Sequence, residues 1–155
     1  MSRPINKLKS TANFYSLEKK DDINLCICQL VKKLYKKDKN IIIIDNDDKL
    51  AVIDKLLWSF QQNSFLPHKI LLDDSLDTPI LLVSSQNVHK LKMCKEYTEI
   101  INNYEKPLIE YNNNANVYEF VLSNEENKII SRNKYTQYKN NSFNVMHIKY
   151  NEQAI

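Results

Sequence analysis

Four residues between positions 124 and 139 have the types and spacing to bind an anionic group. Lys128, Arg132, Tyr135 and Lys139 recur at i, i+4, i+7 and i+11, so in a helix they share one narrow face. Three cations with an aromatic ring among them can hold a carboxylate and shelter an apolar side chain beside it. A solvated helix face can show the same spacing, and the spacing alone leaves both interpretations open.

Catalytic and metal-binding patterns are not found in the sequence. His68, His89 and His147 stand in separate segments without metal-ligand spacing, and no Ser-His-Asp or Cys-His arrangement is indicated. The three cysteines are odd in number and fit no disulfide framework, which favours reduced structural thiols; they are Cys26, Cys28 and Cys94. We therefore expect no catalytic residues, no metal and no cofactor.

The chain of 155 residues contains no glycine. Phosphate-binding loops and nucleophile elbows need glycine, because the backbone must approach a ligand closely or adopt a positive φ. No glycine-rich nucleotide loop of standard form can therefore exist here. Turn positions that require a positive φ must use other residues, and asparagine tolerates them best.

Charge and hydropathy limit the classes of protein to which this chain can belong. The net charge of +3 is mild, whereas a dedicated DNA-binding domain usually shows a denser basic stripe. No apolar run approaches the roughly 20 residues of a membrane span, and the first ten residues lack the apolar stretch of a signal peptide. We expect a soluble, cytoplasmic protein with one domain over residues 1–155, in which residues 1–11 form a flexible lead.

The hydrophobic pattern predicts alternating strands and helices. Four consecutive isoleucines within 40–45 indicate a central parallel strand that is buried on both faces. Acidic or capping residues predict helices that begin at Asp21–Asp22, at Asn46–Asp48 and at a Ser123–Glu126 capping box, the last running to about Lys139. Further strands are predicted at 12–17, 79–84, 98–102, 117–122 and, as an edge strand, 143–150. This order predicts an α/β sheet with helices packed on it.

The segment 56–70, LLWSFQQNSFLPHKI, contains more aromatic surface than a connecting loop usually has. Trp58 is the only tryptophan of the chain, and a polar insert at 61–64 separates it from Phe65. Buried, these rings would be ordinary core. Exposed, they would form a docking surface.

Several segments together resemble a known family. Segment 56–70, the following DTPILLVS and the later RNKYTQYKNNSFNVMHIKY closely resemble the chi subunit of bacterial DNA polymerase III. That family shows a Trp, a short insert and Ser-Phe-x-Pro-His, and later an Arg-x-x-Tyr-x-x-Tyr helix that leads into a Phe-Asn strand. The likeness extends over essentially the whole chain and includes Asn13-Phe14-Tyr15 at the first strand.

The resemblance implies a Rossmann-like three-layer sandwich, with a mostly parallel sheet and helices on both faces. It also implies a noncatalytic accessory subunit of DNA polymerase III holoenzyme in replication. Such a subunit joins the clamp loader through its psi partner and binds the acidic C-terminal tail of single-stranded DNA-binding protein, which ends in Pro-Phe. Contact with single-stranded DNA would be indirect, and no membrane is involved. The tail-binding residues of the family correspond to Arg132, Tyr135, Lys128, Lys139, Phe65, Val121 and Trp58.

Two positions depart from the family pattern. Thr136 stands where the family commonly has Lys, which removes one cation, and Ser142 stands where it has Gly before the Phe-Asn strand. Lower tail affinity and an altered loop are the expected consequences. The alternative function is a stand-alone single-stranded nucleic-acid binding protein that uses its lysine-rich surface.

Overall fold

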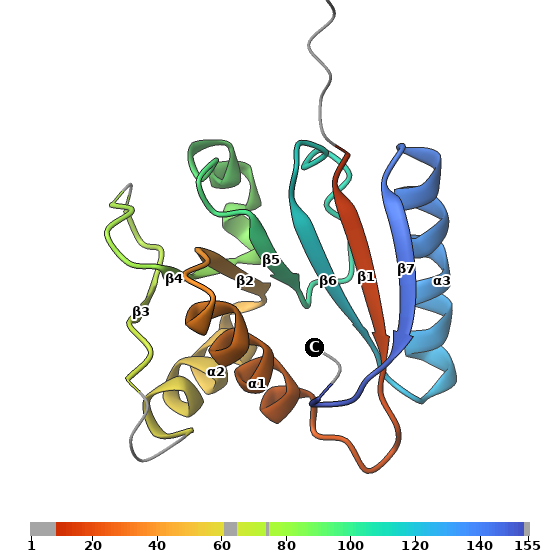
Figure 1. Ribbon diagram of the computed structural model, residues 1–155, viewed down its shortest axis with the longest axis horizontal. Coiled ribbons are helices and arrows are strands. Elements are labelled where there is room, and N and C mark those ends of the chain that lie inside the picture. Colours follow the sequence, from red (N-terminus) through yellow and green to blue (C-terminus); the bar gives the residue numbers. More distant parts are fainter. Residues whose placement is uncertain (1–8, 61–64, 74, 154–155) are drawn as a thin grey trace, which may run out of the picture.

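A seven-stranded sheet forms the centre of the protein in the computed structural model (Figure 1), which describes residues 9–60, 65–73 and 75–153. All strand pairs are parallel, and the order across the sheet is β3-β4-β2-β5-β6-β1-β7. The strands are β1 (Thr11–Ser16), β2 (Ile41–Asp45), β3 (His68–Ile70), β4 (Ile80–Ser84), β5 (Glu99–Asn102), β6 (Asn116–Val121) and β7 (Asn144–Lys149). β3 and β7 are therefore the two edge strands.

Strand β2 explains why the sheet needs cover on both faces. Its isoleucines at positions 41 to 44 are all 0% exposed. Ile41 and Ile43 belong to one core cluster, and Ile42 and Ile44 belong to the other, as alternation along a strand requires. The prediction of a central strand buried on both faces is confirmed.

Helices cover both faces of the sheet. Helix α1 (Ile23–Lys36) and helix α2 (Asp47–Ser59) pack on the face of Ile41 and Ile43. The 3-10 helix η1 (Ser85–Met93) and helix α3 (Glu125–Asn140) cover the face of Ile42 and Ile44. The fold is thus a Rossmann-like three-layer α/β sandwich, as predicted.

The first two predicted helix starts are confirmed, and the third is wrong by one residue. Asp22 and Asn46 cap α1 and α2 by accepting hydrogen bonds from backbone N–H groups of the first turn. The predicted Ser123–Glu126 capping box does not form. Instead Asn124 caps α3, and its Oδ1 accepts from the N–H of Asn127 at 2.9 Å. Asparagine and serine cap a helix about equally well, so two adjacent candidates left the start ambiguous.

Three described residues adopt a positive φ, and only one of them is asparagine: Asp38, Asn114 and Ser142. Ser142, at φ 66°, follows the end of α3 and closes it with two hydrogen bonds. Its N–H donates to the carbonyl of Lys139, and the next N–H, of Phe143, donates to the carbonyl of Tyr138. This is the Schellman arrangement. The serine therefore adopts a left-handed conformation that glycine takes most readily, at the position where the resemblance leads us to expect glycine.

Three further expectations concern the cysteines, metal or membrane binding, and the first residues of the chain. All three cysteines are free and buried, and burial raises the pKa of the Cys26 and Cys28 thiols to about 11, so they stay protonated. Within the described ranges, no cluster of His, Cys, Asp and Glu could hold a metal ion, and no helix is long and apolar enough to cross a membrane. The predicted lead at 1–11 falls mostly outside the described residues, and Thr11 already belongs to β1.

Candidate functional site: two separate surfaces

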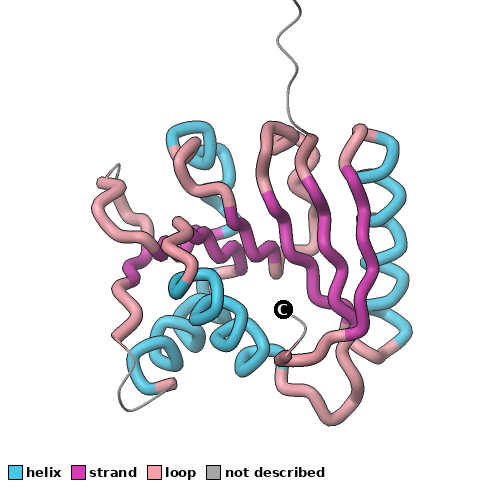
Figure 2. Tube along the Cα trace, in the orientation of Figure 1, coloured by secondary structure: helices cyan, strands magenta, loops and turns pink. Residues whose placement is uncertain are grey.

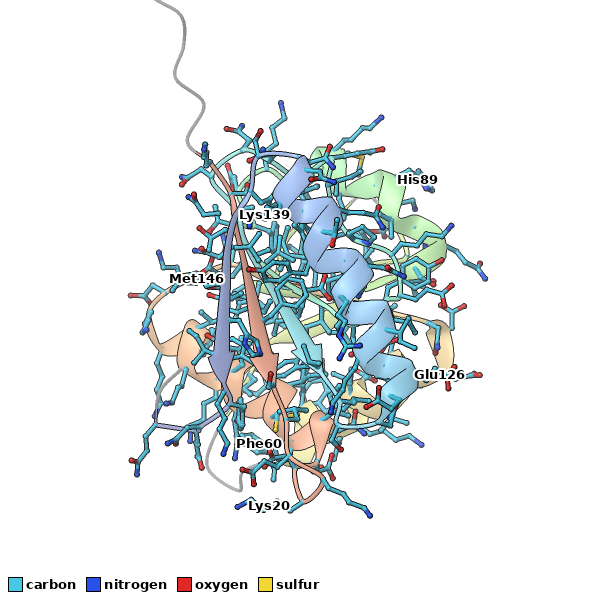
Figure 3. All side chains as sticks on the ribbon, turned by 90° about the vertical axis from the view of Figure 1, so that its right-hand side faces the viewer. Lys20, Phe60, His89, Glu126, Lys139 and Met146 are labelled. Carbon is cyan, nitrogen blue, oxygen red and sulfur yellow. The ribbon has the colours of Figure 1, made fainter. Side chains whose placement is uncertain are left out.

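Helix α3 presents the predicted cationic residues at the β7 side of the sheet. Figure 3 shows α3 beside β7, with Lys139 labelled near the C-terminal end of the helix and Glu126 near its start. Lys128, Arg132, Tyr135 and Lys139 all lie within this continuous helix, so the regular spacing that the sequence suggested is real. We call these four residues, together with Val121 at the end of β6, the α3 face.

The apolar part of the α3 face is anchored in the core. Tyr135 is half-buried, and its ring packs on Phe14 with centroids 5.5 Å apart. Val121, also half-buried, packs against the same core cluster as Tyr135. Because Phe14 is itself only 2% exposed, the Tyr135 ring is held in place before any ligand arrives.

The cations of the α3 face differ in how far they are already paired. The Lys128 Nζ lies 3.8 Å from Glu125 Oε1, one turn earlier on the helix. Arg132 and Lys139 are exposed, and neither forms an ion pair with any residue in the part of the chain that the structure describes. A guanidinium with open donors can take both oxygens of a carboxylate. The α3 face is thus suited to a short anionic ligand with an apolar end.

The inner side of α3 holds a buried polar cluster that the sequence reasoning missed. Lys134, only 6% exposed, places its Nζ 2.8 Å from Glu119 Oε1. The other oxygen, Glu119 Oε2, accepts from the Tyr138 hydroxyl at 2.6 Å and from Asn102 Nδ2 at 2.8 Å. Burial raises the pKa of Glu119, while its neighbours oppose that shift. The cluster fixes α3 on β5 and β6. Glu119 inside the apolar strand VYEFV was the available signal.

Trp58 and Phe65 form a second, aromatic surface at the β3 edge, which we call the Trp58 patch. Trp58, near the C-terminal end of α2, is 58% exposed, and Phe65, before β3, is 69% exposed. Their ring centroids are 6.0 Å apart at an interplanar angle of 45°. The polar insert at 61–64 lies outside the described residues. Trp58 and Phe65 are therefore exposed rings in contact, not core residues, whereas Leu57 and Leu66 of the same segment are buried. Large exposed apolar rings of this kind often mark an interaction surface.

A buried histidine supports the Trp58 patch. His68 packs against the Trp58 ring with centroids 4.6 Å apart. Its Nδ1 lies 2.6 Å from the Leu66 carbonyl, and its Nε2 lies 3.0 Å from Asp54 Oδ1. Both ring nitrogens therefore lie within hydrogen-bonding distance of an oxygen atom. Trp58 thus rests on a ring that is fixed from α2 and from the β3 strand.

The structure does not bring the seven predicted tail-binding residues together. The α3 face lies on the sheet face of Ile42 and Ile44, next to edge strand β7, whereas the Trp58 patch lies beside α2 and edge strand β3 (Figure 1). Six strand spacings of roughly 4.8 Å separate the two edges by about 29 Å. One pocket cannot contain both Phe65 and Arg132. The chain has two surfaces of different chemistry.

The fold and these surfaces define a class: a Rossmann-like α/β protein with a cationic helix face at one sheet edge and an aromatic patch at the other. A comparison with curated proteins finds no match. The sequence profile described as DNA polymerase III chi subunit, HolC, matches residues 10–146, and the chain belongs to this family. It is therefore an accessory subunit of the DNA polymerase III complex and has a role in DNA replication.

Proposed function

We propose that the protein links two partners: the psi subunit, at the Trp58 patch, and the acidic C-terminal tail of single-stranded DNA-binding protein, at the α3 face. The observation that carries this proposal is the placement of two unlike surfaces on opposite faces and edges of one sheet. Partners on such surfaces can be bound at the same time without a clash. The subunit would then connect the clamp loader to coated single-stranded DNA in the cytoplasm without touching the DNA itself.

The tail would bind by charge attraction followed by burial of its last side chain. Arg132 would pair with the terminal carboxylate, and Lys128 and Lys139 would attract the acidic residues before it. The terminal Phe would pack on the Tyr135 ring beside Val121. Support comes from Arg132, which forms no ion pair with a described residue, and from the position of the Tyr135 ring on Phe14. The distance across the sheet removes Phe65 and Trp58 from this contact.

The psi subunit would bury the Trp58 patch. Tryptophan dominates the centre of many protein interfaces because it combines a large area with few rotatable bonds. Trp58 and Phe65 offer two large aromatic rings in contact, and no lysine or arginine stands between them in the sequence. Leu72, just beyond β3 and 83% exposed, adds apolar surface near this edge of the sheet.

Isothermal titration with a peptide of the acidic tail ending in Pro-Phe tests the tail contact. Wild-type protein should bind it, and Arg132→Ala should weaken binding by about 1.5–3 kcal/mol, as is typical for a hydrogen-bonded charge. The matched control is Lys55→Ala, which removes one exposed cation from α2 on the other face. An unchanged affinity in Arg132→Ala, or no binding by the wild type, would refute the proposal.

The alternative of direct single-stranded nucleic-acid binding predicts a different result. A lysine-rich surface would bind a bare oligonucleotide, with log K falling by about 0.7 per phosphate contacted as log salt rises. The two-partner proposal expects little or no shift of bare oligonucleotide in a gel. A shift that depends steeply on salt would favour the alternative.

A further inference from the structure

A groove lies between η1 and α3 that none of the proposed contacts uses. In a parallel sheet, the crossover between neighbouring strands is usually a helix that covers the sheet. The connection from β5 to β6, residues 103–115, contains no helix and runs as turns and irregular chain (Figure 2). The helical layer on this face therefore consists of η1 and α3 with no helix between them.

The position that a crossover helix between β5 and β6 would occupy is partly open. It forms a groove of about 1220 Å³ that η1, the 103–115 connection and α3 all line. Leu91, Leu108 and Ala115 form a buried apolar floor, and Val88 and Ile130 contribute half-buried apolar walls from η1 and α3. Small-molecule sites usually measure roughly 300–1,000 Å³. A volume above that range and a long apolar floor suit a segment of polypeptide better than a small ligand.

The charge along the groove is uneven. The wall from η1 and the residues just after it carries Lys92 and Lys95, which are exposed and form no ion pair with a described residue. The opposite wall has the neutral Asn133 and Gln137 of α3. Lys134 is already held by Glu119. The wall from η1 is therefore cationic and the wall from α3 is neutral, whereas the 103–115 connection carries Glu105, Lys106 and Glu110.

We propose that this groove docks an amphipathic helix from a partner protein, with its apolar face on the groove floor and an acidic flank against Lys92 and Lys95. An amphipathic helix laid in an apolar groove is an established mode of recognition, and here it would occupy the vacant crossover position. Glu105 and Glu110, on either side of Lys106, line the groove from the 103–115 connection, so the acidic flank of the helix must lie at the η1 wall, away from them. Single-stranded nucleic acid fits less well, because its phosphates are charged along the whole strand and would also meet these glutamates.

The groove is distinct from the proposed tail site although both involve α3. The groove takes the Ile130, Asn133 and Gln137 side of the helix, which turns toward η1. The tail site takes the Arg132 and Tyr135 side, which turns toward Phe14 and β7. Figure 3 shows η1, marked by His89, on the side of α3 away from β7. The two sites can therefore be tested independently.

The probe is a fluorescein-labelled helical peptide of about 18 residues with leucines at i, i+3, i+4 and i+7 and glutamates along one flank. Anisotropy titration should show binding to the wild-type protein. The double variant Lys92→Glu, Lys95→Glu should bind at least about tenfold more weakly. A peptide with lysine in place of each glutamate should bind the double variant better than the wild type. Arg132→Ala should leave the affinities of the protein for the acidic and for the basic peptide unchanged.

Amide chemical shifts locate the bound peptide. Shifts confined to Val88, Leu91, Ile130 and their neighbours are expected, and Gln137→Trp, which places a bulky ring on an exposed wall position, should abolish them. Three outcomes would overturn the inference: no shift in the groove, equal binding of the acidic and basic peptides, or tight binding of an oligothymidylate that depends on Lys92 and Lys95. Loss of peptide binding in Arg132→Ala would instead assign the peptide to the tail site.

Discussion

The α3 face and the Trp58 patch both present aromatic rings, but they differ in what surrounds those rings. On the α3 face the Tyr135 ring is half-buried against Phe14, and cations stand on either side of it. In the Trp58 patch both rings are largely exposed, and the polar pair of His68 and Asp54 lies against the Trp58 ring. The first arrangement suits a short anionic ligand. The second suits an extended apolar partner surface.

The largest effect should come from truncating the aromatic patch. Trp58→Ala with Phe65→Ala should weaken binding of the psi subunit by more than about 2 kcal/mol, because exposed paired rings of this kind act as hot spots. Binding of the tail peptide, measured by isothermal titration on the same sample, should not change. The free energy of unfolding should also stay close to that of the wild type, since both rings are mostly solvated.

Ile129→Ala is the matched control for this double variant. Ile129 is 53% exposed on α3, so its truncation removes apolar surface of a similar kind outside the patch. It should leave psi binding intact. If the double variant also loses the tail peptide, the two surfaces are coupled and the comparison between them fails.

Salt should weaken binding at the two surfaces to different extents, and this effect should be intermediate in size. Raising the sodium chloride concentration from about 0.05 to 0.5 M should weaken binding of the tail peptide by about tenfold, because exposed charges are screened. Psi binding at the Trp58 patch should change by less than about twofold, since its anchors are uncharged rings. Titrations at several salt concentrations give, for each surface, the slope of the logarithm of the binding constant against the logarithm of the salt concentration. Equal slopes would mean that charge contributes alike to both surfaces.

The sequence predicted the elements of this fold better than the assembly of its site. Hydrophobic runs and caps located six of the seven strands and all three α-helices, because burial and capping are local properties. The three-residue β3 was too short to predict from its pattern. The four helical residues of the α3 face came from helix spacing, which is also local, whereas Val121 came from the family resemblance. The prediction that Phe65 and Arg132 share one pocket came from the family resemblance. Whether these residues lie together depends on strand order, which no local pattern encodes.

Placing a lysine at position 136, where the resemblance leads us to expect one, should have a smaller effect. Thr136 is exposed one turn after Arg132, and its hydroxyl donates to the Arg132 carbonyl at 3.1 Å. Thr136→Lys should tighten tail binding by about 0.3–1 kcal/mol, the range of an exposed charge contact. The gain should vanish at high salt. Thr136→Gln, which is similar in length but neutral, is the control, and an equal gain there would exclude a charge effect.

The smallest effect should come from Ser142, which closes the helix that carries Arg132 and Lys139. A left-handed conformation costs a residue with a Cβ roughly 1–2 kcal/mol, and glycine avoids this cost but loses more chain entropy on folding. Ser142→Gly should therefore raise the free energy of unfolding by about 0.5 kcal/mol, measured by urea denaturation. Ser142→Ala keeps the Cβ and should give no gain. Tail affinity should stay unchanged in both, because the hydrogen bonds of Ser142 and Phe143 to Lys139 and Tyr138 already hold the end of α3 in place. A change in affinity with glycine would mean that strain at position 142 influences the geometry of the α3 face.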